Sequence, residues 1–201
     1  MAGIYALQQL GGLRVSGQAV YGRSDWDASR GLPLFARTAT SSFKSTEVRA
    51  SLRVDYSIDI NTGFELTPFA RGEVRYFRFD GFDETGAGSI GLSVERRSKT
   101  VFTPEVGMRI GGSPDNGSRI RPFAEGSYLL QGDPGTDRVM NFLGDGATVF
   151  RAEGVRPDDA IKAAVGVTAD MSRMTLFARA DYASGGRQQV GSVRGGALFK
   201  F

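Results

Sequence analysis

The stretch Thr46-Glu47-Val48-Arg49-Ala50-Ser51-Leu52-Arg53-Val54-Asp55-Tyr56-Ser57-Ile58-Asp59-Ile60 alternates between two kinds of side chain. The even-numbered positions are almost all apolar, and the odd-numbered positions are all charged or serine. Because successive side chains of a strand point to opposite faces, the pattern predicts a strand with one apolar and one polar face. At about 15 residues, it is long for a globular strand and suits a tilted strand that crosses a membrane.

Similar alternation recurs in other segments along the chain, and turn residues separate these segments from one another. We predict an all-β fold, an antiparallel outer-membrane β-barrel with about nine strands visible, and a single domain over residues 1–201. The predicted strands are Ala2–Leu10, Leu13–Tyr21, Thr46–Ile60, Phe64–Tyr76, Phe102–Ile110, Ile120–Gln131, Ile161–Asp170, Met174–Tyr182 and Gln189–Phe201. Alternation alone also fits a soluble β-barrel or sandwich, which likewise has one apolar face.

The lengths of the connections favour the membrane barrel, because short and long connections alternate along the chain. Outer-membrane barrels have short periplasmic turns and longer extracellular loops. The one exception is the last hairpin, at Ser184–Gly186, whose connection is short although it lies on the same side as the long loops. The predicted short turns are Leu10–Gly12, Asn61–Gly63, Gly111–Ser118 and Met171–Arg173, and the predicted long loops are Gly22–Lys44, Arg78–Ile90 and Gly132–Asp159.

Aromatic residues of the apolar face gather at the two ends of the predicted strands. Such belts form where amphipathic rings meet the two membrane interfaces, and a soluble core has no reason to make them. The predicted aromatic girdle consists of Tyr21, Tyr76, Tyr128 and Tyr182 at the extracellular end and Phe64 at the periplasmic end, joined there by Phe199 and Phe201.

The polar face carries charges of both signs, which suits a hydrated lumen where they pair across strands. A solvated outer face of a soluble sandwich is the competing interpretation. The charges that we expect to line the lumen are Arg49, Arg53, Asp55, Arg71, Glu73, Arg75, Glu105, Arg109, Glu125, Arg179 and Asp181.

The composition removes several classes of function. The chain has no cysteine and no histidine, so it cannot form disulfides, thiolate sites or a histidine-based catalytic triad or zinc site. A net charge of +3 with interspersed signs does not resemble a nucleic-acid-binding stripe. No apolar run is long enough for a membrane helix, and no secretory signal is visible at the start, so we expect an exported protein to carry it upstream. We expect no cofactor and no catalytic or metal-binding residues.

Three weaker features have structural interpretations that we favour. The stretch Gly86–Gly91 matches a dinucleotide-binding fingerprint, but that fingerprint needs a helix after it, so an extracellular loop is the better interpretation. The acidic residues Asp80, Asp83 and Glu84 have oxygen ligands suited to a divalent cation, and a solvated loop is the more frequent explanation. Carboxylates of the polar face lie close to arginines or lysines, which favours charge pairing over acid–base catalysis.

The last eight residues, Arg194-Gly195-Gly196-Ala197-Leu198-Phe199-Lys200-Phe201, resemble the terminal strand signal of outer-membrane proteins. The matching positions are Arg194, Gly196, Phe199 and Phe201. The resemblance implies that the barrel-assembly machinery reads these positions.

Several further stretches resemble the C-terminal translocator barrel of type V autotransporters, in order along nearly the whole chain. They are Gly12–Arg23, Leu66-Thr67-Pro68-Phe69-Ala70, Asp80–Ala87, Gly91-Leu92-Ser93-Val94 and Arg121-Pro122-Phe123-Ala124. The resemblance implies a twelve-stranded barrel in the Gram-negative outer membrane that exports an N-terminal passenger.

This sequence departs from the family pattern, because it shows no passenger, no lumen-plugging helix and only nine strands. We therefore expect an N-terminally truncated barrel with three strands upstream. The expected partners are outer-membrane lipid and lipopolysaccharide, the barrel-assembly machinery and a passenger in cis, with no nucleic acid. The alternative function is a structural outer-membrane barrel or a passive pore without a passenger, and the sequence upstream of Met1 would distinguish the two.

Overall fold

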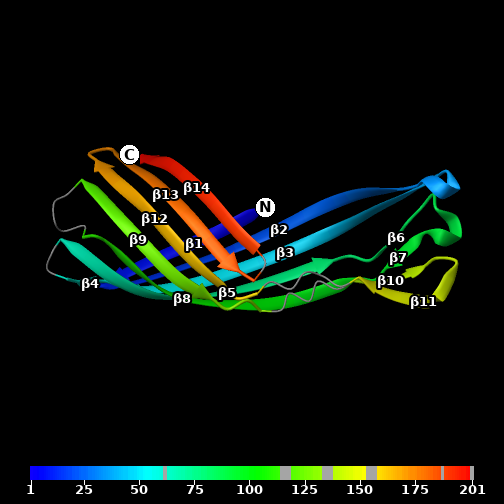
Figure 1. The fold of residues 1–201 in the computed structure, drawn as a ribbon, viewed down its shortest axis with the longest axis horizontal. Coiled ribbons are helices and arrows are strands. Elements are labelled where there is room, and N and C mark those ends of the chain that lie inside the picture. Colours follow the sequence, from blue (N-terminus) through cyan, green and yellow to red (C-terminus); the bar gives the residue numbers. More distant parts are fainter. Residues whose placement is uncertain (61–62, 114–118, 133–137, 153–157, 187, 200–201) are drawn as a thin grey trace.

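The computed structural model describes residues 1–60, 63–113, 119–132, 138–152, 158–186 and 188–199. Its main element is an antiparallel sheet whose strands follow the order β1-β2-β3-β5-β8-β9-β12-β13-β14 (Figure 1). A short strand, β4 (Ile58–Asp59), pairs with β5 beside this path. The nine strands are β1 (Ala2–Leu10), β2 (Leu13–Leu32), β3 (Arg37–Tyr56), β5 (Phe64–Phe79), β8 (Arg97–Gly112), β9 (Ile120–Leu129), β12 (Ala160–Met171), β13 (Met174–Gly185) and β14 (Gln188–Phe199).

The nine predicted strands and their antiparallel order are therefore confirmed. Two predicted turns are also confirmed. β1 ends at Leu10 and β2 begins at Leu13, and β12 ends at Met171 and β13 begins at Met174. Gly11 has a positive φ of 59°, a conformation that glycine adopts without strain. The predicted turns 61–63 and 111–118 lie partly outside the described residues.

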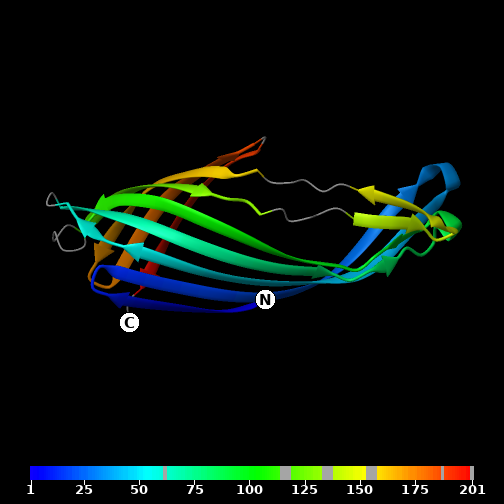
Figure 2. The ribbon, with the colours of Figure 1, turned by 90° about the horizontal axis from the view of Figure 1, so that it is seen from below.

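The sheet curls into an open trough (Figure 2). Every residue of β1 and of β14 is exposed, and in the described part of the chain no strand ladder joins these two edges. The described fold is a half-barrel with two free edges.

The prediction of a loop over Gly22–Lys44 is wrong. Strands β2 and β3 are 20 residues long each and remain paired up to Leu32 and Arg37, on either side of a short 3-10 turn, η1 (Pro33–Phe35). Both faces of the extension carry charged or polar side chains, with Trp26 and Phe43 among them on one face, so its sequence lacks the alternation by which the other strands were recognised.

The other two predicted long loops, Arg78–Ile90 and Gly132–Asp159, also contain ordered structure. They contribute to a second sheet with the order β11-β10-β7-β6, which lies beside the tip of the β2–β3 hairpin (Figure 1). Its elements are β6 (Phe82–Asp83), β7 (Leu92–Val94), β10 (Arg138–Phe142) and β11 (Asp145–Ala152), with the 3-10 turn η2 (Gly88–Ile90) before β7.

Among the described residues, no helix is long and apolar enough to pass through a membrane.

Candidate functional site

The charged face of the main sheet is its concave face, as one ion pair shows directly. Arg53 of β3 lies 3.6 Å from Glu125 of β9, although β5 and β8 separate these strands in the sheet. Side chains so far apart in a flat sheet could not meet. The curvature of the sheet brings them together over its inner face.

Further ion pairs cross this face between strands that are not neighbours. Glu125 also lies 3.2 Å from Arg179 of β13, and Glu105 of β8 lies 3.3 Å from Lys162 of β12. Glu105 lies 3.7 Å from Arg71 of the adjacent strand as well. These side chains line a cleft of about 530 Å³ in the trough.

The remaining charges extend the network along the same face. Asp55 is 2% exposed and lies 2.8 Å from Arg53 and 3.4 Å from Arg14. At the end nearer the second sheet, Arg49 lies 3.6 Å from Glu73. Glu47, which was not among the predicted lumen charges, accepts hydrogen bonds from Arg49 and from Arg75.

Several of the predicted lumen charges also contact aromatic rings, and Arg109 is one of them. Its guanidinium lies 3.9 Å from the centre of the Phe123 ring, a cation–π contact. Arg53 stacks in the same way on Phe69, at 3.7 Å. The concave face therefore contains aromatic rings among its charges.

The inward orientation of Phe69 and Phe123 was not predicted from the sequence, although both lie in stretches that resemble the autotransporter barrel. Phe69 stands directly opposite Gly107 on the neighbouring strand, and Phe123 stands opposite Gly166. A methyl group at Gly107 would lie 2.5 Å from the Phe69 ring, so only glycine leaves room for it. The sequence does show a phenylalanine at a position that the alternation assigns to the polar face. It does not show the glycine opposite, because that pairing depends on the strand register.

The convex face is apolar and uncovered. Val54 of β3 is 36% exposed and Val165 of β12 is 58% exposed, although both are β-branched aliphatic residues. An exposed apolar surface of this extent marks an interaction site or a membrane contact.

The register places the tyrosines of the predicted girdle on this face in two pairs, and along β8 the position paired with Tyr76 (Thr100) is six residues from the one paired with Tyr128 (Val106). Tyr21 and Tyr76 are both paired with Val48, from either side of β3. Tyr128 is paired with Ile161, and Tyr182 is paired with Ala163 two residues further along β12. Phe64, paired with Gly112, lies at the opposite end of the sheet.

The predicted terminal signal occupies the edge strand β14. Arg194 donates a hydrogen bond of 2.8 Å to Asp181 on the concave face. Gly196 stands opposite Phe177, where a methyl group would lie 2.8 Å from the ring. Phe199 is exposed on the other face, and Phe201 lies outside the described residues.

The acidic and glycine-rich segment around residues 80–91 contacts the β2–β3 hairpin. The expectation of a solvated loop is wrong for Glu84, whose side chain is 8% exposed and pairs with Arg30 of β2. Asp80 pairs with Arg78 at 3.1 Å and with Arg96 at 3.8 Å. Among the described residues, no group of three or more Asp and Glu side chains is placed to hold a metal ion.

The stretch Gly86–Gly91 does not have the context of a nucleotide-binding loop. It forms the 3-10 turn η2 and leads into the short strand β7, with no α-helix after it. Gly86 and Gly88 have positive φ values of 83° and 64°, and Gly91 accepts a backbone hydrogen bond from Leu143. The glycines therefore serve tight packing of the second sheet.

The curled antiparallel sheet, with a charged concave face and an apolar convex face, defines an outer-membrane β-barrel. The family model described as "Autotransporter beta-domain" matches residues 1–181, and the chain belongs to this family. This membership locates the chain in the outer membrane.

Solved structures are similar to the chain, and one of them aligns with it over most of its length. The translocator domain of autotransporter NalP from Neisseria meningitidis aligns with a TM-score of 0.67 and 19% identity. The alignment covers 97% of this chain and 63% of that one, so the chain spans less than two thirds of the length of the NalP translocator structure. No curated protein matches the sequence.

Proposed function

We propose that the chain is the membrane anchor and translocator for an N-terminal passenger in type V secretion, and that it has no enzymatic activity. The observation that carries this proposal is the set of ion pairs that converge over the concave face, above all Arg53 with Glu125. Together with the family membership, it supports a water-filled passage rather than a packed core.

Paired charges of both signs suit the passage of a polypeptide. A lumen with one sign of charge would hold a segment of opposite charge, whereas a neutralised lumen holds neither sign strongly. The same pairing argues against catalysis. Glu105, Glu125 and Asp181 each have at least two cationic partners, so none is placed as a free acid or base.

We further propose that strands outside this sequence close the barrel between β1 and β14. An unpaired strand edge in hydrocarbon costs several kcal/mol for each unsatisfied backbone group. The alignment with only 63% of the NalP translocator structure supports this proposal.

The proposed partners follow from the two faces and from the terminal strand. The convex face and its tyrosines would contact outer-membrane lipid and lipopolysaccharide. Arg194, Gly196, Phe199 and Phe201 would be read by the barrel-assembly machinery. Replacing Phe199 with Ala should then lower the amount of assembled barrel, while replacing Ala197, its same-face neighbour on β14, with Ser should not.

The translocator function is tested on the full-length protein with an epitope placed upstream of the barrel. In intact cells, the epitope should become accessible to external antibody in proportion to the heat-modifiable, assembled form of the protein. A barrel that assembles fully while the epitope stays inside the cell would contradict the proposal. That result, combined with steady conductance in planar bilayers, would support a passive pore.

A further inference from the structure

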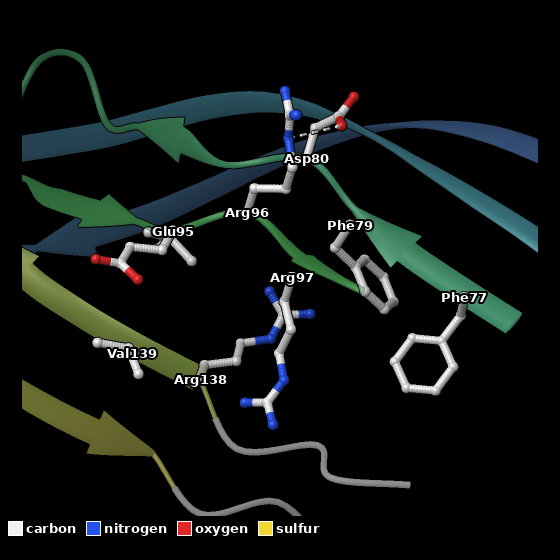
Figure 3. Close-up of a pocket in the computed structure, with 9 residues that line it drawn as sticks. Phe77, Phe79, Asp80, Glu95, Arg96, Arg97, Arg138 and Val139 are labelled. Carbon is white, nitrogen blue, oxygen red and sulfur yellow. Dashed lines mark ion pairs between the residues drawn. The ribbon is translucent and has the colours of Figure 1, made fainter. Parts of the chain in front are cut away.

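A second cavity lies where the main sheet meets the second sheet (Figure 3). It has a volume of about 350 Å³, within the range of small-molecule sites. Phe77 and Phe79 of β5 line one side, and Arg97 of β8 and Arg138 of β10 line another. The cavity is distinct from the charged cleft further along the trough, with which it shares no lining residue.

The cavity opens on the aqueous side of the sheet. Phe77 and Phe79 continue the odd-numbered series of β5 to which Arg71 and Glu73 of the concave face belong. Arg97 is paired directly with Phe79 and so has the same orientation. Lipid packed on the convex face would not reach these side chains, so a ligand would enter from water.

Two guanidinium groups in this cavity lack an acidic partner. Asp80 and Glu95 are the two carboxylates that line the cavity. Asp80 already pairs with Arg78 and with Arg96. Within the described residues, neither Arg97 nor Arg138 lies in an ion pair with a carboxylate, and Figure 3 shows the Glu95 carboxylate directed away from both.

The aromatic side of the cavity contacts one of these two cations. The Arg138 guanidinium lies 5.0 Å from the centre of the Phe79 ring, and the Phe77 and Phe79 rings form an edge-to-face pair at 5.9 Å. Two like charges that share one partly desolvated cavity repel each other, and a bound anion would relieve that repulsion.

We propose that this cavity binds a small aromatic anion, meaning a phosphate or carboxylate group carried on an aromatic ring. Guanidinium forks match the oxygens of such a group in bidentate geometry. The phenylalanine rings supply a face on which the ligand's ring can stack.

Phenyl phosphate is a suitable probe, and equilibrium dialysis against the full-length protein in non-ionic detergent measures its binding, with empty micelles as the blank. We expect saturable binding of phenyl phosphate. Inorganic phosphate, which lacks the ring, and phenol, which lacks the charge, should each bind at least tenfold more weakly.

The variants R97Q and R138Q should each weaken phenyl phosphate binding by tenfold or more, and R97K should retain more affinity than R97Q. The matched control is R23Q, which removes an exposed arginine of β2 outside the cavity and should leave binding unchanged. Heat-modifiability of each variant shows that the barrel is intact. Absence of saturable binding, equal binding by all variants, or equal affinity for inorganic phosphate would overturn the proposal.

Discussion

Arg30 and Glu84 lie 54 positions apart in the sequence and form a two-point ion pair in which Arg30 Nε donates to Glu84 Oε1 at 3.1 Å. The second oxygen of Glu84 accepts from Arg30 Nη2 and from the backbone N–H of Leu92. Next to this pair, Thr40 and Thr85 exchange two backbone hydrogen bonds of 2.9 and 2.8 Å. These contacts join the β2–β3 hairpin to the segment before the second sheet.

Replacing Glu84 with Gln should loosen this junction while leaving the barrel assembled. Glu84 is nearly buried, but Arg30 is 40% exposed, so solvent screening reduces the value of the pair. We expect a local loss of about 1 kcal/mol, which corresponds to roughly fivefold faster amide exchange. Hydrogen-exchange mass spectrometry of the peptides that contain Thr40 and Thr85 measures it.

The control for this variant is Glu95→Gln, which neutralises an exposed carboxylate in the same region. It should leave the exchange of Thr40 and Thr85 unchanged. Equal acceleration in both variants would mean that overall charge, rather than the Arg30–Glu84 pair, holds the junction.

The junction should also open in acid. The hydrogen bond from Arg30 lowers the pKa of Glu84 below its ordinary value of 4.5, against burial, which raises it, and the Leu92 N–H adds to the lowering. A carboxyl group with a lowered folded-state pKa stabilises the fold above its unfolded-state pKa. That stabilisation is lost as the pH falls through the folded-state pKa.

Trp26 is the single tryptophan and reports this transition. It stacks on Phe43, whose ring lies 4.8 Å from that of Phe82 in the segment beside Glu84. Tryptophan emission should be constant above the ordinary pKa of Glu84 and should shift as the pH falls below it. The Glu84→Gln variant should lack that shift, and an identical titration curve in the variant would refute the assignment.

The inward aromatic rings make a separate prediction about stability. A methyl group at Gly166 would lie 2.5 Å from the Ala178 carbonyl oxygen and 2.6 Å from the Phe123 ring. Gly166→Ala should therefore cost about 1–3 kcal/mol and lower the temperature at which the barrel loses its compact electrophoretic form. Gly126→Ala is the matched control, because no atom lies within 4 Å of the added group. Equal temperatures for both variants would contradict the packing described.

The sequence was sufficient to predict the membrane-spanning part of the fold. In Thr46–Tyr56, one face of the strand meets an apolar environment and the other a polar one, so apolar and polar residues alternate in the sequence. Beyond Tyr21 both faces of β2 are solvated or covered by another loop, and alternation disappears although the strand continues to Leu32. Pairing with β3 maintains the strand there, and pairing is a long-range property.

The charged site was predictable as a set of residues but not as a set of pairs. Parity placed Arg53 and Glu125 on the same face, whereas their contact depends on the curvature of the sheet. The same limit applies to Arg30 and Glu84. Each lies in a polar stretch that resembles a loop, and only the folded hairpin brings them together.

Charge added to the convex face should be far more harmful than charge added to the concave face. Val54→Arg or Val165→Arg would expose a guanidinium to hydrocarbon at a cost of about 2–4 kcal/mol near the middle of the membrane. Ser51→Arg adds the same group on the concave face, where Ser51 is paired with Glu73 of β5. The yield of protease-resistant barrel in the outer membrane measures the difference, and equal yields would reverse the assignment of faces.

Labelling of single cysteines tests most directly whether the concave face is wet and the convex face meets lipid. The chain has no native cysteine, so Ser51→Cys and Leu52→Cys each create one thiol, on adjacent residues of β3 with opposite orientations. In the full-length protein in intact outer membranes, a charged maleimide should label the cysteine at 51 and leave the one at 52 unlabelled until the protein is denatured. Equal labelling at both positions, or faster labelling at 52, would contradict the outer-membrane barrel described.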